Sequence, residues 1–196
     1  MADEHKELVP ILDEEGLTAR KVEEGVPMGS ALEAFTDSER LPKSEWGEGP
    51  WQEEPDEFEF EFEGIPCRMM RNRSGAWSGY VAVPGGHPWY GRPEAEIQGV
   101  RVHGGITYSG PTDIFRHSSK WEDAWWIGFD AAHFCDYSPD HEAFMAKILG
   151  RPSGMSQMGF VTYKDLAFVR RHVEMLARQS MMVARGEPLL LEDDEL

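Results

Sequence analysis

The clearest pattern in the chain is a strict alternation of glutamate and phenylalanine from Glu57 to Glu63. Successive side chains of a β-strand point to opposite faces, so the alternation predicts a strand with a buried phenylalanine face and a solvated glutamate face. Runs of apolar residues bounded by turn residues predict the other strands. They lie at Cys67–Arg71, Trp77–Val83, Glu96–Val102, Gly104–Tyr108 and Ala124–Phe129.

The hydrophobic period changes to that of a helix after Asp136. Pro139–Leu149 has a helical pattern that Gly150 closes. In the longest helix, Thr162 is the expected N-cap, and Asp165 follows at capping-box spacing. Its apolar stripe consists of Leu166, Val169, Val173 and Leu176. Because strands come first and helices last, we expect an α+β fold, a mainly antiparallel sheet covered by C-terminal helices.

The acidic residues gather at the two ends of the chain. The 196 residues carry a formal net charge of −17. Residues 1–63 hold 20 acidic and 5 basic residues, and residues 187–196 hold 5 acidic residues and no basic one. We therefore expect an acidic, largely irregular N-terminal arm at 1–56, a single globular domain at 57–185 and an acidic tail at 186–196. The arm is either a solvated segment or a docking element for a basic partner, with Trp46 and Trp51 as anchors.

Composition narrows the class of protein further. No run of about 18 apolar residues occurs, which argues against a membrane span. The first five residues are acidic and polar, unlike a signal peptide, so we expect a cytoplasmic protein. Cys67 and Cys135 are expected to be buried thiols rather than a disulfide. Acidic ends repel a phosphate backbone, so duplex nucleic acid is not an expected partner.

The candidate catalytic residues are two histidines and two aspartates at the ends of strand-like segments. His103 precedes two glycines, and Asp130 ends the run Trp125–Phe129. His133 and Asp136 follow Asp130 at three-residue steps, so a helical turn over 131–136 would project all three in similar directions. With His103 supplied by a neighbouring strand, two imidazoles and two carboxylates would converge.

Three interpretations of this cluster stay open at the level of sequence. The groups form a satisfied polar pair that fixes a turn, a metal-free site with one histidine as base, or a site for Zn²⁺, Mn²⁺ or Fe²⁺. No HExxH, CxxC, GxGxxG, Walker or GxSxG motif is present to choose among them, so the metal and cofactor are left open.

A second group of residues is expected to bind ligand around the cluster. Gly104 and Gly105 allow close approach of the backbone to a ligand or a neighbouring strand. His87, in Gly85-Gly86-His87-Pro88, either builds a turn or lies on a flexible lip over the site, and Tyr108 offers a hydroxyl. The remaining histidines attract no special hypothesis. They are His5, His117, His141 and His172.

Four motifs occur in a fixed order along the chain. They are Gly79-Tyr80-Val81-Ala82-Val83-Pro84, Gly86-His87-Pro88, His103-Gly104-Gly105-Ile106-Thr107-Tyr108 and Trp126-Ile127-Gly128-Phe129-Asp130-Ala131-Ala132-His133. Over residues 64–180 the sequence resembles a family of small uncharacterised bacteriophage and prophage proteins, especially of actinobacteria. A cysteine often follows Gly-Phe-Asp in that family, whereas Ala131 stands here, which argues against an essential thiol. The resemblance implies a phage origin and a compact domain, and it brings no settled activity.

Two functional hypotheses follow from these observations. In the first, a phage accessory protein carries a His/Asp pocket that processes a nucleotide or another small ligand, most simply as a hydrolase. In the second, a non-catalytic interaction or inhibitor protein binds a host factor through its acidic arm, and the His/Asp cluster only holds the fold together. If the chain is phage-encoded, its location would be the host cytoplasm. A distant kinship to ADP-ribosyl-transferring enzymes is a weaker third hypothesis, prompted by the His-Gly step before a tyrosine.

Overall fold

A computed structural model describes residues 8–13, 16–21, 41–111, 124–151 and 161–189 of the chain. Its main element is a five-stranded antiparallel sheet with the strand order β3-β4-β5-β7-β6. The strands are β3 (Glu57–Phe62), β4 (Ile65–Arg71), β5 (Trp77–Val83), β6 (Tyr108–Pro111) and β7 (Trp125–Asp130). A separate hairpin is formed by β1 (Leu8–Asp13) and β2 (Gly16–Lys21). The rest of the expected arm before Leu41, and the tail from residue 190, lie outside the described residues.

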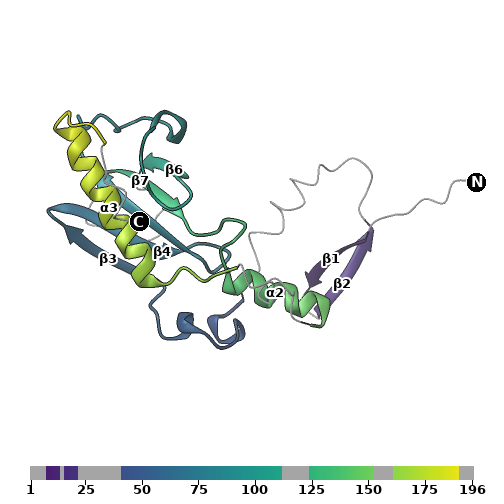
Figure 1. The fold of residues 1–196 in the computed structure, drawn as a ribbon. Helices are drawn as coiled ribbons and strands as arrows, with labels where there is room; N and C mark the ends of the chain where they lie inside the picture. Colours follow the sequence, from purple (N-terminus) through teal and green to yellow (C-terminus); the bar gives the residue numbers. More distant parts are fainter. Residues whose placement is uncertain (1–7, 14–15, 22–40, 112–123, 152–160, 190–196) are drawn as a thin grey trace, which may run out of the picture.

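Helix α3 (Leu166–Ala184) lies along one face of the sheet (Figure 1). Val169, Val173 and Leu176 are fully buried in the main core, as the apolar stripe predicted. The contact is close because β5 has Gly79 beneath the helix, where any Cβ would collide with the side chain of Val173. The α+β class and the helix-covered antiparallel sheet are therefore confirmed.

The N-terminal cap of α3 differs from the sequence prediction. The helix begins at Leu166, and the side chain of Asp165 accepts a hydrogen bond of 2.7 Å from the backbone N–H of Phe168. Thr162 instead forms an isolated parallel bridge with Asp136. Both residues are good cap types, and this bridge holds Thr162 in extended backbone outside the helix.

Helix α2 (Pro139–Leu149) has the predicted bounds but does not cover the sheet. It packs at one side of it, against a small second core in which Leu41, Trp46 and Trp51 are buried (Figure 1). Ala143 and Phe144 are the residues of α2 that contact this core. The packed region thus includes Leu41, Trp46 and Trp51, which lie before the boundary expected at residue 57.

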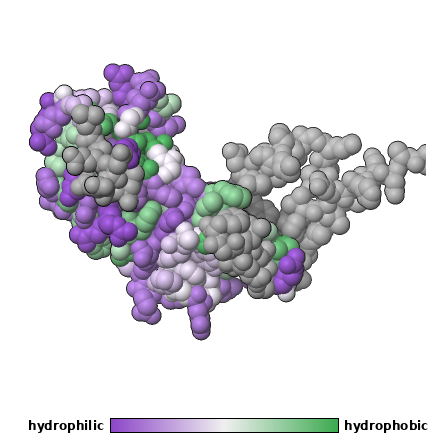
Figure 2. Space-filling model, in the orientation of Figure 1, coloured by the Kyte–Doolittle hydropathy of each residue, from purple (hydrophilic) through white to green (hydrophobic). Residues whose placement is uncertain are grey.

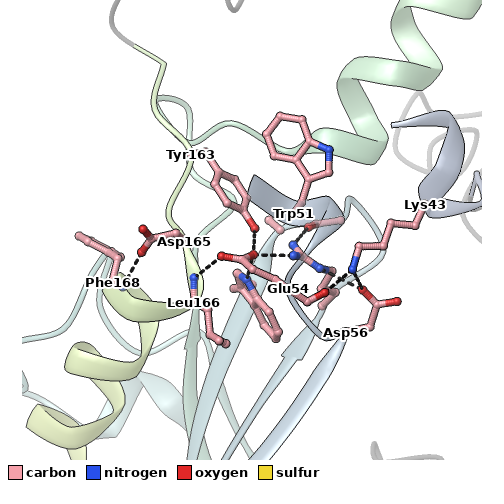
Figure 3. A network of polar contacts seen from close by, with 12 residues as sticks. Lys43, Trp51, Glu54, Asp56, Tyr163, Asp165, Leu166 and Phe168 are labelled. Atoms are coloured by element: carbon pink, nitrogen blue, oxygen red, sulfur yellow. Dashed lines mark hydrogen bonds and ion pairs between the residues drawn. The ribbon is translucent and has the colours of Figure 1, made fainter. Parts of the chain in front are cut away.

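Glu54 ties this N-terminal segment to the sheet and to α3 (Figure 3). Its carboxylate accepts hydrogen bonds from Arg71 at 2.7 Å, from the indole of Trp77 at 3.0 Å, and from the hydroxyl of Tyr163. It also accepts one of 2.8 Å from the backbone N–H of Leu166, the first residue of α3. An acidic group at a helix N-terminus is stabilised by the helix dipole, so Glu54 acts as a cap supplied from a distant segment.

The segment between β5 and β6 is the largest departure from the sequence prediction. Neither Glu96–Val102 nor Gly104–Tyr108 is a strand, apart from Tyr108, which opens β6. Gly99, Gly104 and Gly105 have φ values of +78°, +67° and +85°, which interrupt an extended chain. β7 pairs with β5 on one side and with β6 on the other, so the sheet is continuous without these residues.

The surface, the helices and the two cysteines complete the description of the fold. Hydrophilic surface, in purple, covers most of the described part of the sheet and α3, with smaller green hydrophobic areas between (Figure 2). Within the described residues, no helix is long and apolar enough to cross a membrane. Cys67 is a buried free thiol, as expected, whereas Cys135 is a free thiol exposed on the turn after β7, contrary to the expectation for it.

Candidate functional site

The candidate site is built around Asp136, at the end of the turn that follows β7. The turn closes through a 2.8 Å hydrogen bond from the backbone N–H of Asp136 to the carbonyl of His133. The parallel bridge to Thr162 then fixes Asp136 beside the residues that lead into α3. These backbone restraints hold the carboxylate inward, where only 8% of the residue is exposed.

Two imidazoles and one backbone amide converge on a single carboxylate oxygen. Oδ2 of Asp136 lies 2.7 Å from Nε2 of His103 and 3.1 Å from Nδ1 of His133. It also accepts a hydrogen bond of 2.9 Å from the backbone N–H of His133. The other oxygen, Oδ1, lies 3.8 Å from the ammonium of Lys164. Three of the four predicted catalytic residues are therefore brought together.

These contacts decide the charge of Asp136. Burial by itself would raise the pKa of this carboxyl, but hydrogen bonds from His103 and His133 outweigh it, and the pKa lies below its usual value. Asp136 is therefore ionised at neutral pH and can only accept hydrogen bonds. It follows that His103 donates from Nε2 and His133 donates from Nδ1.

The donor assignment leaves one lone pair on each imidazole whenever that ring is neutral. In the described part of the chain, no group hydrogen-bonds to Nδ1 of His103 or to Nε2 of His133. His133 is the more accessible of the two, since 37% of its side chain is exposed, against 22% for His103. An imidazole held by a carboxylate at one nitrogen, with no hydrogen bond at the other, has the arrangement of a general base.

His172 of α3 belongs to the cluster, although the sequence analysis attached no hypothesis to it. Its Nδ1 accepts a hydrogen bond of 3.2 Å from the backbone N–H of His103, so it holds the loop that carries that residue. Burial, with the nearby charges of His103, Arg171 and Lys164, lowers the pKa of His172 to about 4. A neutral ring is required for this bond, because a protonated Nδ1 cannot accept. The one feature of the sequence that could have identified His172 is its position next to Val173 in the predicted apolar stripe of the helix.

Gly104 makes room for the ring of His133. A Cβ at residue 104 would collide with Cε1 and Nε2 of that ring, so no larger residue fits without moving it. The rings of His103 and His133 consequently meet edge to face, with their centroids 5.1 Å apart. Gly105 has no atom within 4 Å of such a Cβ, so its predicted role in close approach is not seen within the described residues.

Asp130, the fourth predicted catalytic residue, does not join the cluster. Its Oδ1 accepts a hydrogen bond of 3.0 Å from the backbone N–H of Ala132 and so stabilises the start of the turn. The neighbouring Phe129 belongs to the main core under α3 and contacts His172. Adjacent strand residues point to opposite faces, so Asp130 faces away from that core. The expected helical turn over 131–136 is a non-helical turn instead, which is why the three-residue steps do not align the side chains.

His87 and Tyr108 also lie apart from Asp136. Nε2 of His87 hydrogen-bonds the carbonyl of Ser180 at 2.9 Å, and its Nδ1 accepts from the backbone N–H of Trp89 at 3.0 Å. Ser180 lies about 12 Å along α3 from His172 at the usual helical rise, so His87 fastens a different part of that helix. Tyr108 donates to the carbonyl of Pro111 and packs edge-to-face on Tyr80, in the small cluster around Trp126.

A hollow of about 520 Å³ opens beside the cluster, between the turn after β7 and α2. His133 and Asp136 line it from the turn, and Ser138, His141 and Glu142 line it from the start of α2. Ser74 lines it from the β4–β5 turn, and the other lining residues are Ala132, Phe134, Met145, Leu149 and Val161. A cavity of this size next to an oriented imidazole can hold a small ligand.

The same three residues also offer donor atoms that could hold a metal ion. One donor atom from each of His103, His133 and Asp136 lies within 4.8 Å of the others. Donor atoms around a tetrahedral zinc ion would be about 3.3 Å apart, whereas Nε2 of His103 lies 2.7 Å from Oδ2 of Asp136, a hydrogen-bond distance. The ammonium of Lys164 near Oδ1 also repels a cation. The geometry therefore fits a hydrogen-bonded His–Asp–His cluster better than a metal centre.

Comparisons of the chain with protein-family models, curated proteins and solved structures find no match. The resemblance to phage proteins stays a prediction. The geometry around Asp136 is thus the main support for a functional inference.

Proposed function

We propose that the chain is a small metal-independent enzyme, most simply a hydrolase, in which His133 is the general base and Asp136 orients it. The observation that carries the proposal is the buried carboxylate of Asp136, which accepts hydrogen bonds from two imidazoles, one of them exposed to a hollow. Burying a carboxylate is costly, and a purely structural turn would need only the backbone bond to His133.

The proposed reaction uses the lone pair on Nε2 of His133. A water molecule in the hollow gives a proton to Nε2 while its oxygen attacks the electrophilic centre of the substrate. The leaving group then takes that proton from Nε2 as its bond to the substrate breaks. Asp136 stabilises the imidazolium formed in between, because its carboxylate accepts the Nδ1–H bond of the same ring.

We also propose that the protein is a phage accessory protein. Two of the four motifs that carry the phage resemblance contain residues of the cluster, namely His103 and Gly104 in one and His133 in the other. These motif residues surround Asp136 rather than only filling the core. This supports an activity at this site that the chain would share with the phage proteins it resembles. The alternative is a non-catalytic interaction protein that binds through its acidic arm. It would be favoured if the following test refutes the proposal.

The test combines turnover with direct observation of the imidazoles. Chromogenic esters, amides and phosphodiesters are offered to the wild type, His133→Ala, Asp136→Asn and the matched control Asp130→Asn, which keeps the acceptor for Ala132. We expect turnover that falls about 100-fold or more in the first two variants and not in the control. Two-bond ¹H–¹⁵N spectra should show neutral His133 protonated at Nδ1. Unchanged turnover in a folded His133→Ala protein, or protonation at Nε2, would refute the proposal.

A further inference from the structure

We infer that Gln179 of α3 is a positioning residue for the proposed site. It fixes the segment that carries His103, and through His103 it fixes the carboxylate of Asp136. The importance of Gln179 for catalysis rests on the proposed function, in which Asp136 orients His133. The role follows from how the chain before Gly104 is attached to α3.

Residues 100–103 lie between two glycines that turn the chain. Gly99 and Gly104 have φ values of +78° and +67°. Val100 and Val102 pack against the main core, whereas the alternating residues Arg101 and His103 are joined to α3 through their backbones. Residues 100–103 belong to no strand, so side chains of the helix take the place of a neighbouring strand for them.

Gln179 makes the shorter of these attachments. Its Oε1 accepts a hydrogen bond of 2.7 Å from the backbone N–H of Arg101, and its Nε2 donates one of 3.0 Å to the carbonyl of the same residue. One amide thus pairs with both backbone groups of Arg101, as an opposite residue in an antiparallel sheet would. The bond from the backbone N–H of His103 to Nδ1 of His172 is longer, at 3.2 Å. Gln179 is therefore the stronger of the two restraints.

Gln179 is also a fully buried amide, with 0% of the residue exposed. It follows His172 by seven residues, about two helical turns, so both side chains project from the same side of α3. Its Nε2 donates a second hydrogen bond, of 3.2 Å, to the carbonyl of Met175, so both donor hydrogens are used. An apolar side chain could fill this position without the cost of burying an amide. What the amide adds is a fixed register between α3 and Arg101.

The restraint at Arg101 reaches the proposed site through His103. Nε2 of His103 donates to Oδ2 of Asp136 at 2.7 Å, and the same oxygen accepts from Nδ1 of His133 at 3.1 Å. The ring of His103 also packs edge to face on Phe168 of α3, with the centroids 5.3 Å apart. Helix α3 thus supports both the backbone and the ring of His103. Loss of the backbone restraint would free His103 to move, so Oδ2 of Asp136 would no longer be held in place for His133.

The experiment compares Gln179→Met with a matched control, Ser180→Ala. Methionine is close to glutamine in length but cannot make the hydrogen bonds of its amide. Ser180→Ala removes a buried side-chain bond of 2.7 Å to the carbonyl of Ala177, which lies within the same helix. Two-bond ¹H–¹⁵N spectra report the tautomer of His103, and amide hydrogen exchange reports the backbone N–H groups of Arg101 and His103. Neither measurement requires a substrate.

In the wild type we expect slow exchange at both N–H groups and a neutral His103 that is protonated at Nε2. In Gln179→Met both groups should exchange about 10-fold faster or more, and His103 should sample both tautomers. Ser180→Ala should leave these signals unchanged. With a substrate that the wild type turns over, kcat should fall about 10-fold in Gln179→Met. KM should stay nearly constant, because Gln179 does not line the hollow.

Fast exchange at Arg101 or His103 in the wild type would overturn the inference, and this measurement is valid even if the variant does not fold. A Gln179→Met protein with a lower Tm but unchanged His103 signals would identify Gln179 as a core residue only. Unchanged turnover despite a mobile His103 would also overturn the inference. If His103 changes as expected but the wild type turns over no ester, amide or phosphodiester, the hydrolase proposal fails while the coupling of Gln179 to His103 stands.

Discussion

Nε2 of His103 lies 2.7 Å from Oδ2 of Asp136, although 33 residues separate them in the chain. His103 comes from a glycine-rich loop, and Asp136 from the turn after β7. Helix α3 supports that loop through the bond from the backbone N–H of His103 to His172 and through the bonds between Arg101 and Gln179. The cluster is thus held by three segments, and each can be tested separately.

Gly104→Ala and Gly105→Ala form a matched pair that tests the space made for His133. Both residues have positive φ, so either alanine strains the backbone by about 1–2 kcal/mol. Only the alanine at 104 also collides with the ring of His133. We expect Gly104→Ala to lower the free energy of unfolding by about 1–3 kcal/mol more than Gly105→Ala in urea unfolding. Equal losses would mean that the ring can move away without cost.

His172→Asn tests the pH dependence that a buried neutral imidazole gives to stability. The folded pKa of His172 is about 4, against 6.5 when unfolded. As pH falls below 6.5 the unfolded chain binds a proton that the folded chain does not, so the stability present above pH 6.5 is lost towards pH 4. The ring is partly exposed and its charge is screened, so we expect a loss of about 1 kcal/mol between pH 7.5 and 5.0.

Asparagine keeps an acceptor near the position of Nδ1 and does not titrate. The variant should therefore fold and show a smaller pH dependence over the same range in urea unfolding. His87, whose pKa is also lowered, contributes equally to both proteins. A variant with the full pH dependence of the wild type would show that His172 is not its source.

Glu54→Gln tests the network that joins the N-terminal segment to α3 (Figure 3). The substitution replaces a charged acceptor with a neutral one. It also places an amide NH₂, which is itself a donor, opposite a donor of Trp77, Tyr163 or Leu166. We expect the free energy of unfolding to fall by about 2–4 kcal/mol. Glu53→Gln, at the exposed neighbouring position, is the control and should change it by less than about 0.5 kcal/mol.

The stabilisation from Glu54 should also depend on pH in a defined direction. Burial alone would raise the pKa of this carboxyl, but its hydrogen bonds outweigh burial and lower it below 4.5. The stabilisation is therefore present above pH 4.5 and is lost as pH falls through the folded pKa. Acid unfolding followed by circular dichroism should show a difference between wild type and Glu54→Gln that shrinks below pH 4.5. A constant difference would contradict the assignment.

Metal content separates the two chemical interpretations of the cluster. We expect protein purified without a His tag to carry well under one equivalent of zinc, manganese or iron by plasma mass spectrometry. Added zinc should leave its Tm unchanged, because Lys164 and the existing hydrogen bonds oppose a cation at Asp136. Near-stoichiometric metal that disappears in His103→Ala and Asp136→Ala would establish a metal centre instead.

Several elements could be predicted from sequence because they depend on short-range order. The Glu–Phe alternation defines β3, and the apolar run from Trp77 to Val83 defines β5. The stripe through Val169, Val173 and Leu176 correctly identifies the buried face of α3. In each case the period of apolar residues reports which face is buried, whatever the partner.

The segment Leu41–Asp56 and the loop before β6 could not be predicted in the same way. Trp46 and Trp51 are buried because α2, Tyr137 and Tyr163 pack against them, and the intervening glycine and proline residues leave no regular period. The loop from Glu96 to Tyr108 contains strand-forming residues, yet Gly104 and Gly105 take positive φ values and turn it away from the sheet.

For the site, the sequence by itself determined four candidate catalytic residues, and three of them meet in the structure. It singled out His103, His133 and Asp136 because polar groups follow strand-like runs at turns. Only the tertiary structure decided that Asp130 faces away from the core, that His172 and Lys164 belong to the cluster, and that Gly104 accommodates an imidazole. The physical reason is that residue type and local period are properties of neighbouring positions. The meeting of a loop, a turn and a helix around one carboxylate depends on packing between segments far apart in the chain.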